Sequence, residues 1–232
     1  MDFSDILISR FPSFLQAFDE LCPFNKPGQL RNHLATIKRL RELGSPEAAL
    51  KDETFLQSLY DTLVAWGIGA RGSVLKLYPV FVSALQARSD EIAELGKFGV
   101  DHEDLDLEWV APRLGSLIKT LDIVENETKI AGGSKALHHL LPDLVPPMDR
   151  AYTKTFFGWN DGQFQYRTEE CVAEALRAYV QIAQATNPGQ YVKDGCWHSS
   201  RTKVIDNAIV GFVLVALQKI RMEAEPSGRT EG

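Results

Sequence analysis

The sequence is dominated by a helical spacing of apolar residues, and this spacing limits the fold more than any other feature. Between Ile6 and Leu21, large apolar side chains recur at steps of three and four residues, and Pro12 splits the pattern into two helices. No segment alternates apolar and polar residues between turn signals, as a strand would. The sequence therefore predicts an all-α protein of roughly ten helices. The further apolar stripes cover residues 30–43, 55–66, 74–85, 107–121, 172–183 and 204–220.

Length and composition are those of an ordinary globular chain. The 232 residues are 44% hydrophobic and 24% charged, which suits one large domain. We expect residues 1–222 to form a single all-α domain, in which two lobes meet near the acidic, glycine-containing residues 96–106. Residues 223–232 are polar and include Pro226 and Gly228, and we expect a flexible tail there.

Several features argue against a membrane span or an export route. The longest apolar run, Ala208 to Leu217, has ten residues, whereas a membrane span needs about 20. The first residues lack the basic and apolar pattern of a secretion signal, so we expect a cytoplasmic location. Cys22, Cys171 and Cys196 are widely separated, which favours reduced thiols over a disulfide framework or a zinc site.

Neither a metal nor a cofactor is expected. His138 and His139 are adjacent and therefore point to different sides of a helix, which does not suit a shared metal ion. Residues 67–72 match the glycine spacing of a dinucleotide-binding loop, but they follow a predicted helix where that loop requires a strand.

The net charge of −6 and the isoelectric point of about 5.4 disfavour indiscriminate binding to polyanions. The charge is uneven, however. Residues 26–41 contain five basic side chains and no acid, while residues 90–108 contain eight acids and one lysine. This distribution is compatible with one basic face. It is equally compatible with ordinary solvated helix surfaces and a solvated loop.

The most distinctive segment is residues 130–152, which read IAGGSKALHHLLPDLVPPMDRAY. A glycine pair between two helices allows a turn with positive φ, after which the N–H groups that open the next helix point outward and attract a phosphate. Ser134 is expected to cap that next helix, which carries Lys135 and which Pro142 ends after about two turns. Pro147 suits the first position of a following helix, with Asp149 in its first turn.

This segment resembles the helix-hairpin-helix, Gly-Pro-Asp superfamily of DNA base-excision glycosylases, over about a tenth of the chain. The resemblance implies a helix-hairpin-helix near residues 115–142, with the N- and C-terminal segments joined in the other lobe. It also implies that Gly132, Gly133 and Ser134 contact a DNA phosphate. As catalytic residues it implies Lys135, which would attack the sugar C1′, and Asp149, which would stabilise an oxocarbenium-like sugar.

Further DNA contacts are predicted outside the hairpin. Arg150 and Lys154 are close to Asp149 in sequence and are candidates for phosphate binding. The loop before the last apolar helix combines Trp197, His198, Arg201 and Lys203, which suits stacking on a base and contact with a phosphate. A plainer interpretation is that Trp197 packs over the core and that Ser200 or Thr202 caps the last helix. The tryptophans proposed for a base pocket are Trp66, Trp109, Trp159 and Trp197.

Three functions remain open from the sequence. The first is a DNA glycosylase, with or without lyase activity, that excises a damaged or modified base. The second is a non-catalytic DNA-binding module, because Lys135 and Asp149 are 14 positions apart, about one helical turn fewer than is usual in the family. The third is a helical protein of unrelated use that binds a partner or a small molecule. DNA is the expected partner, and the sequence leaves the base and the oligomeric state undetermined.

Overall fold

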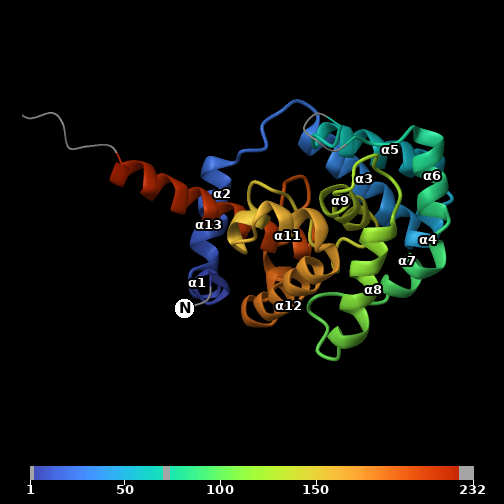
Figure 1. The fold of residues 1–232 in the computed structure, drawn as a ribbon. Helices are drawn as coiled ribbons and strands as arrows, with labels where there is room; N and C mark the ends of the chain where they lie inside the picture. The colour runs from blue at the N-terminus through green and yellow to red at the C-terminus, as the bar shows by residue number, and fades with distance from the viewer. Residues whose placement is uncertain (1–2, 70–73, 225–232) are drawn as a thin grey trace, which may run out of the picture.

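The structure is a computed structural model that describes residues 3–69 and 74–224, with side chains up to residue 220 (Figure 1). The prediction of an all-α protein is confirmed: this part of the chain forms thirteen α-helices and one 3₁₀ helix, and contains no strand beyond an isolated bridge between Leu75 and Val124. The helices are α1 (Phe3–Ser9), α2 (Phe11–Leu21), α3 (Gln29–Leu43), α4 (Pro46–Ala49), α5 (Glu53–Ala65), α6 (Tyr78–Gln86), α7 (Ser89–Leu95), α8 (Leu107–Thr120), α9 (Ile130–Leu140), α10 (Thr153–Phe156), α11 (Asp161–Tyr166), α12 (Thr168–Thr186), η1 (Pro188–Tyr191) and α13 (Arg201–Ala224).

One group of helices joins the two ends of the chain. Helices α1 and α2 pack against α12 and α13, and α10 and α11 complete the group (Figure 1). The backbones of α2 and α13 come very close at Gly211, where an added Cβ would lie 2.0 Å from the carbonyl oxygen of Phe14. A glycine is required there because any side chain would separate the two helices.

The second group runs from α3 to α9. Helix α3 packs on α4, α5 and α9, and α8 packs on both α9 and α12, which connects the two groups. A continuous cluster of buried apolar side chains extends through both. The chain passes between the groups along residues 22–28 and again along residues 141–152. Residues 96–106, where we expected the lobes to meet, connect α7 to α8 within the second group.

Two predicted helix ends, at Pro12 and at Ser45, are present in the structure. The helix break near Pro12 is present, since α1 ends at Ser9 and α2 begins at Phe11. Ser45 caps α4, with its side chain accepting a hydrogen bond from the N–H of Ala48. The prediction for residues 74–85 needs correction at its start, because α6 begins only at Tyr78.

The C-terminal boundary also differs from the expectation. Helix α13 continues through Ala224, so the first two residues of the predicted tail are helical. The rest of that segment, and residues 70–73 of the glycine-rich segment after α5, lie outside the described residues. Among the described helices none is long and apolar enough to cross a membrane.

The predicted glycine turn is wrong. Gly132 and Gly133 lie inside α9, fully buried, and neither has a positive φ. An added Cβ would lie 2.7 Å from Val124 Cγ1 at Gly132 and 3.1 Å from Ile118 Cγ2 at Gly133. The two glycines therefore let α9 pack closely against the end of α8 and the connection that follows it. They do not turn the chain.

Candidate functional site

A pocket opens where the two groups of helices meet, and it encloses about 110 Å³. Its walls come from elements far apart in the sequence: the connection after α2, the ends of α3 and α5, helix α9, the connection before α10, the loop before α13, and α13 itself. It mixes aromatic rings with two lysines and two aspartates, which is the composition of a ligand site. The lining residues are Phe24, Gln29, Trp66, Lys135, Pro147, Asp149, Trp197, Lys203 and Asp206.

Three aromatic rings form the apolar wall. The ring centroid of Trp197 lies 5.3 Å from that of Phe24 and 6.1 Å from that of Trp66. Beneath them, Phe18 and Val210 belong to the same small apolar cluster, which anchors this wall to α2 and α13. Trp197 thus covers the core, as the plainer interpretation held, and also faces the pocket.

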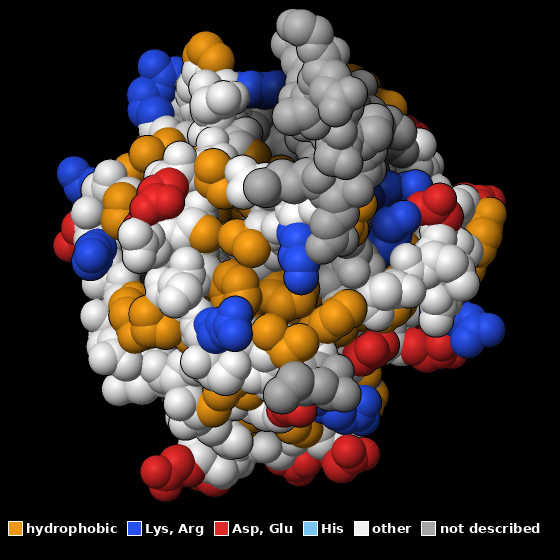
Figure 2. Space-filling model, turned by 90° about the vertical axis from the view of Figure 1, so that its left-hand side faces the viewer, with side chains coloured by type: hydrophobic (Ala, Val, Ile, Leu, Met, Phe, Trp, Pro, Cys, Tyr) orange, Lys and Arg blue, Asp and Glu red, His pale blue; other side chains and the backbone are white. Residues whose placement is uncertain are grey.

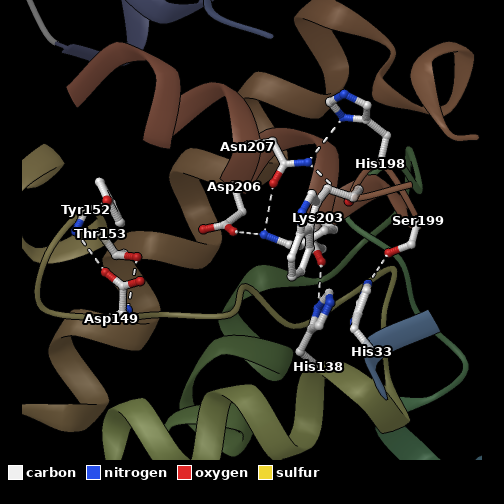
Figure 3. Close-up of polar contacts among 12 residues, drawn as sticks. His33, His138, Asp149, Tyr152, Thr153, His198, Ser199, Lys203, Asp206 and Asn207 are labelled. Atoms are coloured by element: carbon white, nitrogen blue, oxygen red, sulfur yellow. Dashed lines mark hydrogen bonds and ion pairs between the residues drawn. The ribbon is translucent and has the colours of Figure 1, made fainter. Parts of the chain in front are cut away.

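Lys203 is the most unusual side chain of the site, because it is charged and only 2% exposed. Its Nζ donates hydrogen bonds to Asp206 Oδ2 at 2.6 Å and to Asn207 Oδ1 at 2.9 Å (Figure 3). These residues follow Lys203 by three and four positions on α13, so the helix itself brings them together. The ammonium group also lies 5.0 to 6.0 Å from the ring centroids of Phe24, Trp197, Trp66 and Phe18.

Asp206 is buried beside Lys203, and this location changes its acidity. Burial raises the pKa of the Asp206 carboxyl, and the nearby charge of Asp149 adds to the rise, while the ion pair with Lys203 opposes it. Two carboxylates and two lysines therefore meet at one pocket, in an environment that already perturbs the pKa of one carboxyl. Such groupings are concentrated at functional sites.

The loop before α13 is held by its polar side chains. Asn207 Nδ2 donates to the carbonyl of Trp197, and the Ser200 hydroxyl accepts from the N–H of Lys203. Ser200 therefore caps the last helix, as one of the sequence interpretations proposed. His198 is buried, with Nε2 2.9 Å from Asp19 Oδ1 and Nδ1 3.1 Å from Asn207 Nδ2. Both of its ring nitrogens already have protein partners, which does not suit the predicted contact with DNA.

Asp149 lies at the pocket but in a turn, so its predicted place in the first turn of a helix is wrong. The prolines at 146 and 147 keep the preceding backbone out of a helix, and α10 begins only at Thr153. Asp149 Oδ1 accepts a hydrogen bond from the N–H of Tyr152 at 2.8 Å, and the N–H of Asp149 donates to Thr153 Oγ1 (Figure 3). This turn fixes the carboxylate, which remains half-buried.

Lys135 lies on α9 at the same pocket, half-buried, with its Nζ 5.9 Å from the ring centroid of Trp66. The structure thus brings together the two residues that were predicted to be catalytic. Ser134 contributes to this arrangement, although not as the predicted helix cap. Its buried hydroxyl accepts a hydrogen bond from the N–H of Met148, which ties the residue before Lys135 to the residue before Asp149.

The other predicted DNA contacts are not gathered at the pocket. Arg150 and Lys154 both pair with Asp161, at 3.6 and 2.8 Å. Arg201 pairs with Asp101 and Asp143 and lines a separate hollow. Of the four tryptophans, only Trp66 and Trp197 line the pocket. Trp109 packs against Phe98, and Trp159 is buried and donates to Glu174.

A chain of neutral histidines supports the aromatic wall. His139 Nδ1 must donate to the carbonyl of Lys135, at 2.7 Å, so its Nε2 accepts from His33 Nδ1 at 2.9 Å. His33 Nε2 then accepts from the Ser199 hydroxyl at 2.7 Å. The ring of His33 stacks on that of Trp197, with an interplanar angle of 21°. This series of hydrogen bonds links the loop that carries Trp197 to the backbone carbonyl of Lys135.

Burial keeps these histidines uncharged. It lowers the pKa of His139 to about 4, and it lowers those of His33 and His138 well below the usual value. His138 lies 3.0 Å from the carbonyl of Val145 through Nδ1, and its Nε2 has no partner within residues 3–69 and 74–220. Among those residues no group of three or more His, Cys, Asp or Glu side chains is placed to hold a metal ion.

The basic run on α3 is largely neutralised. Arg39 pairs with Asp52, Arg41 with Asp194, and Lys38 with Glu42. Lys26 and Arg31 form no ion pair with any described residue, and they lie three positions before and two positions after the pocket residue Gln29 in the sequence. On the face shown in Figure 2, Lys and Arg side chains are scattered among Asp and Glu, and hydrophobic side chains gather across the middle.

Sequence reasoning missed Phe24, Gln29, Asp206 and Asn207 as site residues. It proposed Lys203 for contact with a phosphate, whereas the structure buries this side chain at the pocket and pairs it with Asp206. A signal was present for two of the missed residues. Lys203, Asp206 and Asn207 share one face of a helix whose other residues are mostly apolar, and charged residues at such positions need partners or a function.

Comparisons of this chain with models of known protein families, with curated proteins and with solved structures found no match.

Proposed function

We propose that the pocket receives a single base turned out of a DNA strand and that the protein acts as a DNA glycosylase. The observation that carries this proposal is that Lys135 and Asp149 line one aromatic-walled cavity together. The cavity volume of about 110 Å³ lies below the roughly 300–1,000 Å³ of pockets that enclose drug-sized ligands. A single planar ring therefore suits it better than a whole nucleotide, with the rest of the strand outside.

The side chains have the chemistry that base removal needs. The carboxylate of Asp149 would stabilise positive charge on the sugar as the bond to the base breaks. The amine of Lys135 would attack C1′, forming a carbon–nitrogen bond as the base leaves with the electron pair of the glycosidic bond and takes up the proton that the nitrogen loses. Cleavage of the C1′–O4′ bond would then open the sugar ring and give a Schiff base. Trp66, Trp197 and Phe24 would stack on the extruded base.

Contacts with the DNA backbone would come from a different place than the sequence predicts. The glycine pair is buried and presents no turn to a phosphate. Lys26 and Arg31 come three positions before and two positions after the pocket residue Gln29 in the sequence, and they have no ion pair within the described chain. These two cations would hold the strand in the proposed complex. Binding through so few cations predicts a shallow dependence of affinity on salt.

We test the proposal with duplexes that each carry one uracil, hypoxanthine, oxidised guanine, alkylated adenine or abasic site. The wild-type protein should release at least one of these bases, and Asp149→Asn should slow that reaction about a hundredfold or more. Asparagine keeps the oxygen that accepts from Tyr152, so the turn should survive the substitution. Strand cleavage at the product site, measured on denaturing gels, gives the rate.

Lys135→Gln should abolish a covalent complex trapped by borohydride, since only an amine forms a Schiff base. Lys38→Gln is the matched control, because Lys38 is 80% exposed and pairs with Glu42 on the surface. Full activity in Asp149→Asn, or no reaction of the wild-type protein with any substrate, contradicts the proposal.

A second function is favoured by the neutralised basic run and the net charge of −6. Both features suit a protein that binds a small planar molecule free in solution better than one that tracks a phosphate backbone. Duplex binding that is absent at low salt, together with binding of a free ring compound, would support this alternative.

A further inference from the structure

The part of the pocket wall that α13 forms contains a hydrogen-bonding pair that the proposed chemistry does not use. Lys203 has three ammonium hydrogens, and two of them are donated to Asp206 and Asn207. Asp206 accepts with Oδ2, while Oδ1 has no hydrogen-bond partner within the described chain. Both residues line the pocket. One ammonium hydrogen of Lys203 and one carboxylate oxygen of Asp206 are therefore left for a ligand, on two side chains that are hydrogen-bonded to each other.

Contacts with the protein hold the ammonium group of Lys203 and, through it, the carboxylate of Asp206. Lys203 is fixed by two hydrogen bonds and by the surrounding rings of Phe18, Phe24, Trp66 and Trp197. Asn207 is itself held by the carbonyl of Trp197 and by His198 (Figure 3). A polar pair that is fixed in this way discriminates strongly between ligands, because a ligand that cannot match it leaves buried groups unpaired.

We propose that Lys203 and Asp206 make the pocket selective for a ring that carries a carbonyl next to a ring N–H, as oxo-purines and oxo-pyrimidines do. The carbonyl oxygen accepts from Lys203, and the ring N–H donates to Asp206. The inference rests on the proposed function in taking the ligand to be a base, and its argument from the departing base rests on the proposed reaction. Lys203 and Asp206 are specificity residues here, distinct from Lys135 and Asp149.

The positive charge of Lys203 explains why the pocket should prefer a ring with a carbonyl over a ring with an exocyclic amino group. A ring with an exocyclic amino group also offers a donor and an acceptor, but its acceptor is a ring nitrogen. A carbonyl oxygen takes up much of the negative charge that develops when the base departs as an anion. An ammonium group at that oxygen in a water-poor pocket stabilises this charge. The same pair therefore favours oxo bases both in binding and in the departure step.

The test measures binding of single rings to the wild-type protein, without DNA and without catalysis. The probes are 1-methyluracil, 1-methylcytosine and 1,3-dimethyluracil, whose N1-methyl group stands for the sugar. Binding is followed by quenching of tryptophan fluorescence, since Trp66 and Trp197 line the pocket. We expect 1-methyluracil to bind about tenfold or more tightly than either of the other two, because each of them lacks the ring N–H.

Variants assign the preference to the two residues. Asp206→Asn keeps a similar shape and a hydrogen bond with Lys203 but adds an N–H donor, so the preference for 1-methyluracil over 1-methylcytosine should fall to within about twofold. Lys203→Gln should weaken 1-methyluracil more than 1-methylcytosine. Lys38→Gln is the control, because Lys38 is 80% exposed and pairs with Glu42 on the surface, and it should keep the preference. Circular dichroism of every variant checks that it is folded. If Asp206→Asn and Lys203→Gln do not fold, the binding of the three rings to the wild-type protein still tests the inference.

The outcomes separate the two proposals. Equal binding of the three rings, or a preference that Asp206→Asn retains, overturns the specificity inference. Base release from duplexes without preference for oxo bases overturns it as well and leaves the glycosylase proposal intact. Selective binding of 1-methyluracil by a protein that releases no base from any duplex supports the inference and overturns the glycosylase proposal.

Discussion

At the scale of single residues, the interior contains polar groups whose energetic roles differ sharply. Tyr179 is fully buried on α12, and its hydroxyl has no hydrogen-bond partner in the described part of the chain. Burial, with the charges of Asp206 and Asp149, raises the pKa of Tyr179 well above its usual value, so the hydroxyl stays neutral. Thr202 is also fully buried, but its hydroxyl donates to the carbonyl of Pro142 at 2.7 Å.

This contrast gives a paired prediction. Tyr179→Phe removes an unpaired hydroxyl, so the free energy of unfolding should be unchanged or higher by up to about 1 kcal/mol. Thr202→Val is the matched control and should lower it by about 1–3 kcal/mol, because the carbonyl of Pro142 loses its donor. Urea unfolding measures both. A loss above about 1 kcal/mol in Tyr179→Phe would mean that its hydroxyl has a partner after all.

At the scale of elements, the closest helix contact lies between α2 and α13. Gly211 lets the backbone of α13 reach that of α2, and the contact places Lys203 and Asp206, on the N-terminal part of α13, beside the aromatic cluster of Phe18. The position of the pocket wall therefore depends on a residue that does not touch the pocket.

We expect Gly211→Ala to lower the free energy of unfolding by about 3 kcal/mol, since the added methyl group meets backbone that cannot rotate away. Gly189→Ala is the control. Its Cβ would find its nearest neighbour at 3.6 Å, an ordinary contact, and the change should stay within about 0.5 kcal/mol. Thermal and urea unfolding check both variants. Similar stabilities of the two would show that α2 and α13 do not approach this closely.

At the scale of the whole molecule, the histidine chain makes stability depend on pH. His33 lies on α3 and His138 and His139 lie on α9, so protonation would charge the interface between these helices. The pKa values of all three are lowered in the folded protein, and the unfolded chain therefore binds more protons between pH 6.5 and the folded values. Asp206 acts in the opposite sense, because its folded pKa is raised.

The contribution of these histidines to the free energy of unfolding should therefore be fully present above about pH 6.5, and it should be lost as the pH drops toward 4. His139 alone, with a folded pKa of about 4, accounts for about 3 kcal/mol of this loss. Urea unfolding at a series of pH values measures the slope. His139→Gln can still donate to the carbonyl of Lys135 and should make the slope shallower. Constant stability between pH 7 and pH 4.5 would contradict a buried, neutral set of histidines.

Part of the candidate site was predictable from residue chemistry alone. Lys135, Asp149 and Trp197 were singled out, and all three line the pocket. Phe24, Gln29 and Asp206 were not, because their importance depends on contacts between segments more than 50 positions apart. Arg201 and His198 suggested DNA contacts in the sequence, but Asp101, Asp143 and Asp19, which pair with them, come from distant segments.

The sequence by itself determined most of the longer helices, because apolar spacing, prolines and capping side chains act within a few residues of one another. It also determined that the part of the chain described here contains no strand beyond an isolated bridge. Only the tertiary structure decided that the glycine pair of α9 packs against α8 instead of turning the chain. It likewise decided that a buried lysine and two aspartates share a pocket, because burial and pairing arise only when distant helices close on one another.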